Sequence, residues 1–168
     1  MNIYLIGFMG CGKTTLGKKI AKKMNKIFFD MDAEIEKSAH LSVAEIFSQY
    51  GESYFRELEN KLLTSIQTKN YIVSTGGGAP CFFNNLEIMN ASGLTIFINL
   101  PAKTLLNRLE NEKDKRPLIQ NTPHDKLLSE IEDRLNKRLP FYQKAQIIFN
   151  PLQQTEEDLL EEIQKRIQ

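Results

Sequence analysis

The sequence lacks the features of a membrane or secreted protein. Its 168 residues include no tryptophan and two cysteines, Cys11 and Cys81, which lie far apart and outside any metal-binding spacing. Few cysteines are typical of proteins of the reducing cytoplasm. Every apolar run is shorter than the roughly 18 residues that a membrane-spanning helix needs, and the run near Met1 lacks the basic residues of a signal peptide. These absences predict a cytoplasmic protein with no membrane partner.

An excess of charge of one sign is also missing. The chain has 22 Lys and Arg residues against 21 Asp and Glu, a net charge of +1. This balance argues against a broad surface for nucleic acid. A length of 168 residues fits one domain, which buries roughly two thirds of the surface of its unfolded chain. We therefore expect a single domain spanning 1–168 that binds no nucleic acid, and, since no interface patch is evident, a monomer.

Short apolar runs alternate with stretches of helical period. The runs predict strands at 3–6, 27–29, 71–73, 95–100 and 147–149. The periodic stretches predict helices at 14–24, 33–39, 42–50, 53–68, 102–112 and 124–138 and after Thr155. Such alternation predicts an α/β fold of three layers, with a five-stranded parallel sheet flanked by helices. Ligands of such sheets bind beyond the carboxyl ends of the strands.

A phosphate-binding motif follows the first predicted strand. Residues 7–14 read GFMGCGKT, which matches G-x-x-x-x-G-K-[ST] and directly precedes a predicted helix. The glycines let backbone N–H groups surround phosphates, and the helix N-terminus adds partial positive charge. Lys13 can reach the β- and γ-phosphates, and the Thr14 hydroxyl can bind Mg²⁺. The alternative, a chance glycine-rich turn, does not explain the strand and helix around the motif.

Two aspartates follow the second predicted strand. If Asp30 and Asp32 continue the strand, they point the same way. Facing the phosphate-binding loop, one carboxylate could serve Mg²⁺ and the other an incoming hydroxyl, because phosphoryl transfer depends mostly on positioning and charge neutralisation. The alternative is that one aspartate caps the helix at 33–39. The sequence leaves both interpretations open.

The polar segment 111–123, interrupted by prolines, has the length of a lid. It contains Arg116, which could close on the transferred phosphoryl group and stabilise its charge. Arg138 precedes Pro140, where we expect the helix at 124–138 to end. An arginine there suits a carboxylate ligand, and equally a plain preference for positive charge at a helix end.

The glycine run 76–78 follows the third predicted strand. Three consecutive glycines expose backbone N–H groups and allow a ligand to approach closely, whereas a loose turn rarely needs three. Phe47 and Phe55 fall on apolar helix faces, where core packing is the ordinary role.

Together these motifs resemble the shikimate kinase family, whose members have the nucleoside monophosphate kinase-like P-loop fold. The resemblance runs from about residue 3 to residue 150. It is carried by GFMGCGKTT (7–15), FDMDAEIE (29–36), GE (51–52), FR (55–56) with Glu59, STGGG (74–78), RPL (116–118) and RLPFY (138–142). The phosphate-binding loop alone would be generic, but the series is specific.

The resemblance implies the roles of the site residues. Lys13, Asp32 and Arg116 would take part in catalysis, and Asp32 would contact the hydroxyl that is phosphorylated. ATP is bound by Gly10, Cys11, Gly12, Lys13, Thr14, Thr15, Arg108 and Arg116, with Arg108 against the adenine ring, and the metal by Thr14 and Asp30. Shikimate is bound by Asp32, Arg56, Gly76, Gly77, Gly78 and Arg138 and by the apolar walls Phe47 and Phe55, on substrate-binding helices at about 32–60. Arg56 and Arg138 would hold its carboxylate.

The activity implied is ATP- and Mg²⁺-dependent phosphorylation of shikimate to shikimate 3-phosphate and ADP, a step of chorismate and aromatic amino-acid biosynthesis. Gluconate kinases share the loop and lid, but would not require the Asp-x-Asp, Phe-Arg and Arg-Leu-Pro-x-Tyr combination. A GTPase switch would show Asn-Lys-x-Asp and Asp-x-x-Gly, and neither occurs. A catalytically dead binding module is disfavoured because every residue that the chemistry needs is present.

Overall fold

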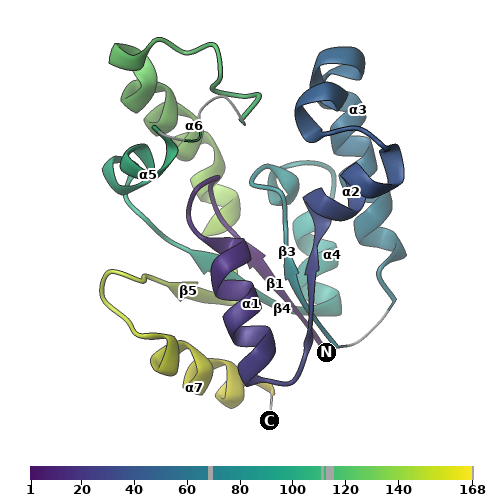
Figure 1. Cartoon of the computed structure of the whole chain (residues 1–168). Helices are drawn as coiled ribbons and strands as arrows, with labels where there is room; N and C mark the ends of the chain where they lie inside the picture. Colours follow the sequence, from purple (N-terminus) through teal and green to yellow (C-terminus); the bar gives the residue numbers. More distant parts are fainter. Residues whose placement is uncertain (68–69, 111, 113–115, 168) are drawn as a thin grey trace.

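Five parallel strands form the centre of the protein. They are resolved in a computed structural model that describes residues 1–67, 70–110, 112 and 116–167. The strands lie in the order β2-β3-β1-β4-β5 (Figure 1). Their bounds are β1 (Asn2–Ile6), β2 (Ile27–Asp30), β3 (Tyr71–Ser74), β4 (Gly93–Ile98) and β5 (Ile147–Phe149). The expected five-stranded parallel sheet is confirmed.

The apolar character of each strand follows its place in the sheet. β1 and β4 pair in the middle, with Ile3 opposite Leu94, and every residue of both strands is buried. A strand covered by helices on both faces needs such an unbroken apolar run. The outer strands β2 and β5 leave Ile27 and Ile148 exposed. Because the neighbours of β1 are β3 on one side and β4 on the other, the chain reverses its direction of winding at β1, where ligands of such sheets bind.

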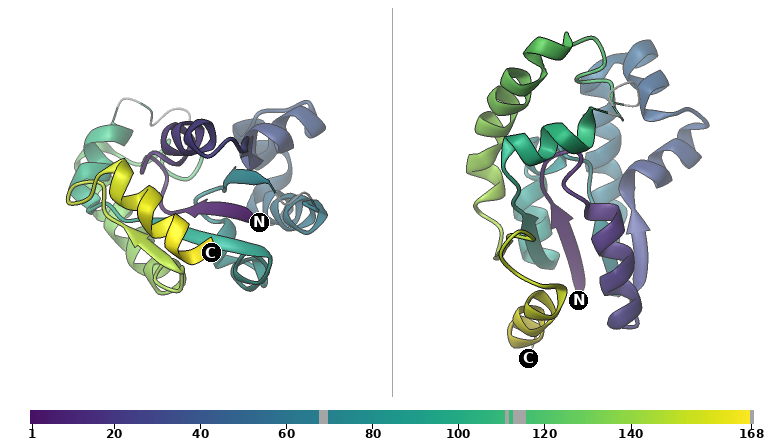
Figure 2. Two further views of the ribbon diagram at one scale, coloured as in Figure 1. Left: turned by 90° about the horizontal axis from the view of Figure 1, so that it is seen from below. Right: turned by 60° about the vertical axis from the view of Figure 1, so that its left-hand side comes forward.

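Helices cover both faces of the sheet. They are α1 (Lys13–Lys23), α2 (Met31–Ala39), α3 (Val43–Ser65), α4 (Asn85–Ser92), α5 (Ala102–Leu109), α6 (Leu127–Tyr142) and α7 (Glu156–Ile167), with 3₁₀ turns η1 (Ala79–Cys81) and η3 (His124–Lys126). Figure 2 shows α1 on one face and α4 on the other. α7 lies beside α1, to which Lys23 and Glu157 tie it at 2.6 Å. No helix in the described ranges is both long and apolar enough to span a bilayer.

The predicted helices at 42–50 and 53–68 form one element with a break. α3 runs from Val43 to Ser65, and Gly51 inside it has φ 83° and ψ 171°, far from helical values. A positive φ combined with a ψ near 180° is essentially restricted to glycine, so this residue sets the angle between the two parts of α3. The expected end at Thr68 lies outside the described residues, as do residues 111 and 113–115 of the expected lid. The helix expected at 102–112 is shorter than predicted, since α5 ends at Leu109 and residue 112 lies in a turn.

The prediction that a helix ends before Pro140 is wrong. α6 continues to Tyr142 with the proline inside its last turn. Pro140 removes a single backbone donor there, while Gln143 still donates to the Leu139 carbonyl at 2.9 Å. Tyr142 is fully buried and stacks on Phe97 of β4 with ring centroids 5.0 Å apart. Packing against the sheet therefore outweighs the local cost of the proline.

Candidate active site

The predicted phosphate-binding loop joins β1 to α1, the context that the motif requires. Gly10 and Gly12 have φ values of 77° and 100°, a region that favours glycine. A Cβ on Gly10 would also come within 3.0 Å of the Leu109 side chain of α5. The loop therefore needs glycine both for its backbone conformation and for its contact with α5.

Lys13 lies across this loop. Its Nζ donates to the carbonyl oxygens of Gly7 at 2.9 Å and Phe8 at 3.1 Å, and the residue is buried. Arg108 of α5 braces the loop from the other side, donating to the Cys11 carbonyl at 3.1 Å. Cys11 itself is 3% exposed, which supports a packing role for its side chain over a reactive one.

Thr14 joins two strand ends. Its Oγ1 donates to Asp30 Oδ2 at 3.0 Å and lies 3.5 Å from Ser74 Oγ. Asp30 and Ser74 are paired in register at the carboxyl ends of β2 and β3, which is why one hydroxyl reaches both. Ser74 was part of the STGGG run that carries the family resemblance, but no role was predicted for it. A further indication was its place as the last residue of a strand before the glycine run.

Asp30 and Asp32 do not continue one strand, so that prediction is wrong, although both residues line the same cavity. β2 ends at Asp30 and α2 begins at Met31, so Asp32 lies on a helix and not on a continued strand. Asp30 is also a helix cap, since its Oδ1 accepts from Ala33 N at 3.3 Å. The capping and metal interpretations of Asp30 are therefore compatible.

Asp32 combines burial with strong nearby charge. Its Oδ1 is buried and has no hydrogen-bond partner in the described structure. Burial raises the pKa of Asp32 above its ordinary value, and the neighbouring Asp30 adds to this rise, while Lys13, Arg116 and Arg56 oppose it. A carboxylate with a raised pKa and a free buried oxygen is suited to accept a proton or a hydrogen bond from a hydroxyl.

Arg56 is held by two carboxylates. Its Nη1 donates to Glu59 Oε2 at 2.6 Å and its Nη2 to Glu52 Oε1 at 2.7 Å. The guanidinium lies 4.6 Å from the centre of the Phe82 ring, and a Cβ on Gly78 would meet it at 2.5 Å. Gly78 must therefore lack a side chain for Arg56 to occupy this position. Glu59 carried the family resemblance, but no role was predicted for it.

Arg138 of α6 lies next to Gly77 of the glycine run. It lies 5.4 Å from the centre of the Phe8 ring and 3.5 Å from where a Cβ on Gly77 would stand. Its Nη1 is buried without a hydrogen-bond partner among the described residues. Tyr142 fixes this part of the run by donating its hydroxyl to the Gly77 carbonyl. A buried, unpartnered guanidinium nitrogen is suited to an anionic ligand.

Two cavities share a wall at the carboxyl ends of the strands. The larger, of about 850 Å³, contains the predicted phosphate and metal residues Gly10, Gly12, Lys13, Thr14, Thr15 and Asp30 together with Arg108. The smaller, of about 70 Å³, contains Phe47, Phe55, Arg56, Gly76, Gly78 and Arg138. Asp32, Gly77 and Arg116 line both. The structure thus brings the predicted residues into two adjoining chambers, with Asp32 between them, except Cys11, which lines a third cavity; their roles stay predictions.

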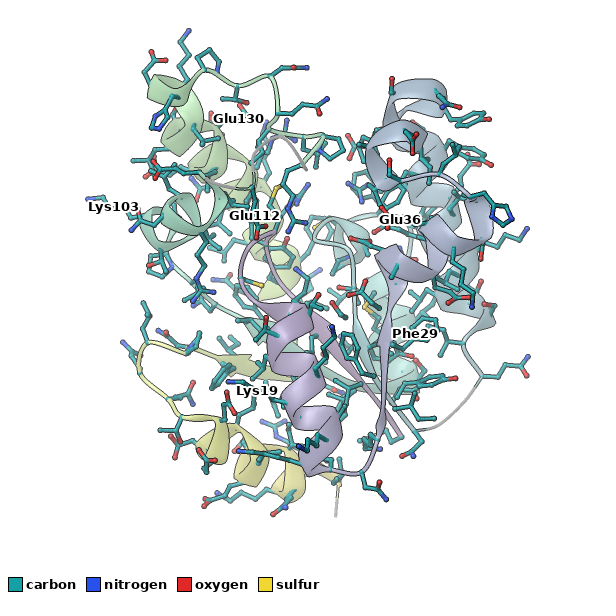
Figure 3. The ribbon with its side chains drawn as sticks, viewed as in Figure 1. Lys19, Phe29, Glu36, Lys103, Glu112 and Glu130 are labelled. Atoms are coloured by element: carbon teal, nitrogen blue, oxygen red, sulfur yellow. The ribbon has the colours of Figure 1, made fainter. Side chains whose placement is uncertain are left out.

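Arg116 belongs to the described part of the expected lid and lines both the larger and the smaller cavity. Its Nη2 donates to Glu112 Oε2 at 3.0 Å, and its Nε is buried without a described partner. Figure 3 shows Glu112 above the loop and Glu36 on α2 across from it, and both line the larger cavity. Phe47 and Phe55, with ring centroids 5.0 Å apart, pack in a small apolar cluster and also line the smaller cavity, so both interpretations of these residues apply.

A third cavity of about 510 Å³ opens on the far side of Arg108. It is lined by Arg108 and Thr15 and by residues around the β5–α7 connection, including Pro151 and Thr155. Because Arg108 lines this cavity and the larger one, a ligand whose phosphates lie in the loop could extend past Arg108 into the third cavity.

The loop between β1 and α1, a carboxylate facing it, and an arginine-lined chamber beyond define a P-loop kinase that acts on a small molecule. The shikimate kinase family model matches residues 9–168. The chain belongs to the shikimate kinase family.

Related proteins extend over most of the chain. Shikimate kinase of Bacteroides thetaiotaomicron is 47% identical over 151 residues, which are 89% of this chain and 86% of that protein. A crystal structure of that enzyme superposes with a TM-score of 0.84. Shikimate kinase of Acinetobacter baumannii, solved in complex with shikimate, is 33% identical, has a TM-score of 0.88 and covers 99% of this chain and 92% of its own.

More distant structures share only the fold. A deoxyadenosine kinase from M. mycoides with bound dATP is 13% identical with a TM-score of 0.59, and a gluconokinase from Sinorhizobium meliloti is 14% identical with a TM-score of 0.57. These matches confirm the P-loop kinase fold. The gluconokinase match shows the fold alone, and the family match and the higher identities favour shikimate kinase over the gluconate kinase alternative.

Proposed function

We propose that the two adjoining chambers transfer the γ-phosphoryl group of ATP to a ring hydroxyl of shikimate, the first chamber holding the phosphates and the second the acceptor. The reaction is that of the family, a kinase acting on shikimate. One observation carries the assignment of chambers: Asp32 stands on their shared wall, with a buried, unpartnered oxygen. A group between donor and acceptor is where phosphoryl transfer needs a residue that orients the hydroxyl.

The nucleotide is proposed to bind along the loop and past Arg108. Backbone N–H groups of residues 10–15 and the start of α1 favour the negative charge of the phosphates. The adenine ring would then lie in the third cavity, against Arg108. The hydrogen bond from Arg108 to the Cys11 carbonyl supports this placement because it fixes the guanidinium between the two cavities.

Magnesium fits the oxygen-rich group at the strand ends. Thr14, Asp30 and Ser74 supply two hydroxyls and one carboxylate, with the Thr14 hydroxyl within hydrogen-bond distance of each of the other two side chains. Mg²⁺ in kinases is usually held by one or two side-chain oxygens together with substrate phosphates and water. Among the described residues, no group of three or more His, Cys, Asp or Glu side chains could hold a metal ion by itself. Bound there, the ion would neutralise phosphate charge.

The chain's own residues have separate tasks in this proposal. Asp32 orients the acceptor hydroxyl and accepts its proton. Lys13 and Arg116, whose charges both act on Asp32, stabilise the charge of the phosphoryl group as it moves. Arg56, next to Gly78, and Arg138, next to Gly77, bind the carboxylate of shikimate and fix the ring.

The reaction is tested by measuring ADP release from the purified protein with Mg-ATP. We expect release that requires shikimate, does not occur with gluconate, and stops when EDTA removes the divalent ion. Release of ADP with gluconate but not with shikimate would show that the substrate has been assigned wrongly. If shikimate-dependent release of ADP were undiminished in EDTA, the proposed metal requirement would be wrong, while the assignment of shikimate as the substrate would stand.

The Arg56→Ala variant should bind shikimate weakly with little change in its ATP requirement. A charge-assisted hydrogen bond contributes about 1.5–3 kcal/mol, so we expect KM for shikimate to rise by roughly 10- to 100-fold, with kcat affected less because the carboxylate does not react. Steady-state kinetics with each substrate varied in turn measure the two effects.

The matched control is Arg134→Ala, since Arg134 pairs with Glu130 on the surface of α6 and lines none of the three cavities described. Its kinetics should match those of the wild type. A rise in KM for ATP alone in Arg56→Ala would show that Arg56 has been assigned to the wrong substrate.

We also propose that the enzyme works as a monomer in the cytoplasm. The residues of both chambers come from one chain, so no partner is required to complete the site. Cys11 and Cys81 are both free thiols, as expected in a reducing compartment.

A further inference from the structure

Glu59 is a buried carboxylate for which the reaction scheme has no task. It is fully inaccessible to solvent, and its Oε2 accepts from Arg56 while its Oε1 has no hydrogen-bond partner in the described structure. A buried carboxylate with an unpartnered oxygen is costly when ionised, and the cost disappears when the group takes up a proton.

The surroundings of Glu59 add negative charge on its unpartnered side. A Cβ on Gly76 would stand 2.0 Å from Glu59 Oε1 and 3.0 Å from Asp32 Oδ1, so the two free oxygens face the same point above the glycine backbone. The other groups that act on Glu59 are Arg56 and Arg138, with the Cys81 thiol of η1 nearby. Burial raises the pKa of Glu59 to about 7, and Asp32 adds to this rise, although the ion pair with Arg56 lowers it.

Shikimate would change this balance because it brings a further carboxylate. Its anion would share Arg56 with Glu59 and Glu52, and it would take up part of the charge of Arg138. Both changes remove positive charge that stabilises ionised Glu59, and both place a new negative charge near it. The protonated form of Glu59 is therefore favoured more strongly in the complex than in the free protein.

We propose that Glu59 is a positioning residue that takes up a proton when the carboxylate of shikimate binds to Arg56. Protonation relieves the repulsion between the two carboxylates and leaves Glu59 able to accept from Arg56 through Oε2. The proposal rests on the proposed function, because it requires the carboxylate to bind at Arg56. It adds a linkage between shikimate affinity and pH.

The sign of this linkage follows from the direction of the shift. A group whose pKa is higher in the complex than in the free protein binds a proton on association, so affinity falls as pH rises through the interval between the two values. The Kd for shikimate should therefore rise above about pH 7, by at most tenfold for each pH unit. The carboxylate of shikimate is ionised throughout this range and contributes no slope.

The test is calorimetric titration of shikimate into the protein with ADP present, so that no turnover occurs, at several pH values from 6 to 9. At pH 7.5, titrations in two buffers of different ionisation enthalpy give the number of protons taken up, and we expect about half a proton or more for each shikimate bound. The variant Glu59→Gln, which imitates the protonated side chain, should take up none and should show a Kd nearly independent of pH.

The matched control is Glu57→Gln. Glu57 is exposed on the same helix and lines none of the three cavities described, so the variant should keep the proton uptake of the wild type. Binding by the wild type without proton uptake would overturn the proposal, as would an unchanged slope in Glu59→Gln.

A wild-type proton count near zero would overturn the proposal even if Glu59→Gln fails to fold, and loss of the uptake in Glu59→Gln assigns the proton to Glu59 and not to the neighbouring Asp32. Failure of the proposed function gives a different result, since a protein that does not act on shikimate would show no binding heat at any pH. Binding without proton uptake would leave the function standing and remove only the role of Glu59.

Discussion

Replacing Asp32 with Asn is expected to lower kcat by about 10²- to 10⁴-fold, the usual contribution of a residue that accepts a proton in the transition state. Asn has nearly the same shape, so the wall between the chambers is retained. The melting temperature should not fall, because burial raises the pKa of Asp32 and the folded state therefore disfavours the ionised form that Asn removes. Single-turnover measurements of ADP formation with saturating shikimate would give the loss directly.

Glu34→Gln serves as the comparison for this variant. Glu34 is on the same helix but pairs with Lys37 at 3.8 Å and lines neither chamber. Its kcat should equal that of the wild type. A kcat within tenfold of the wild type in Asp32→Asn would remove Asp32 from the chemistry and leave it a binding role only.

Replacing Lys13 with Ala is expected to lower kcat by roughly 10²- to 10³-fold, the loss typical of one group that stabilises developing charge. The side chain also holds the Gly7 and Phe8 carbonyls, so a moderate fall in stability of about 1 kcal/mol should accompany the loss. Shikimate binding should persist because Lys13 does not line the smaller chamber. Retained binding measured by calorimetry separates loss of chemistry from loss of fold.

Lys22→Ala is the control, since Lys22 is exposed on the same helix and removing it tests whether positive charge on α1 matters in general. It should behave as the wild type does. Normal turnover in Lys13→Ala would contradict the assignment of the loop lysine to the phosphates.

Local patterns were enough to predict the sheet and the loop. The motif at 7–14 depends on neighbours in the chain, and its strand and helix were visible as apolar periodicity. Asp30 and Asp32 were grouped correctly for a wrong reason, because the sequence does not show where a strand stops and a helix starts. The end of α6 was missed because the burial of Tyr142 against Phe97 is a contact between distant segments.

The residues that the sequence did not assign are those defined only by tertiary contacts. Ser74 gains its role from its register with Asp30, and sequence spacing gives no register. Glu59 follows Arg56 by three residues, so the sequence alone indicates that the two side chains share one face of a helix. Its complete burial and its position above Gly76 depend on how α3 packs against the segment after β3.

The glycine run bears on how this protein can vary in evolution. The space above each glycine is filled from a different direction: Glu59 stands over Gly76, the loop backbone at Met9 over Gly77, and Arg56 over Gly78. A change in the length or volume of any of these partners alters the space above one glycine. Substitutions at Arg56 and Glu59 should therefore be tied to substitutions in the run, so that these positions vary together among distant homologues or remain fixed together.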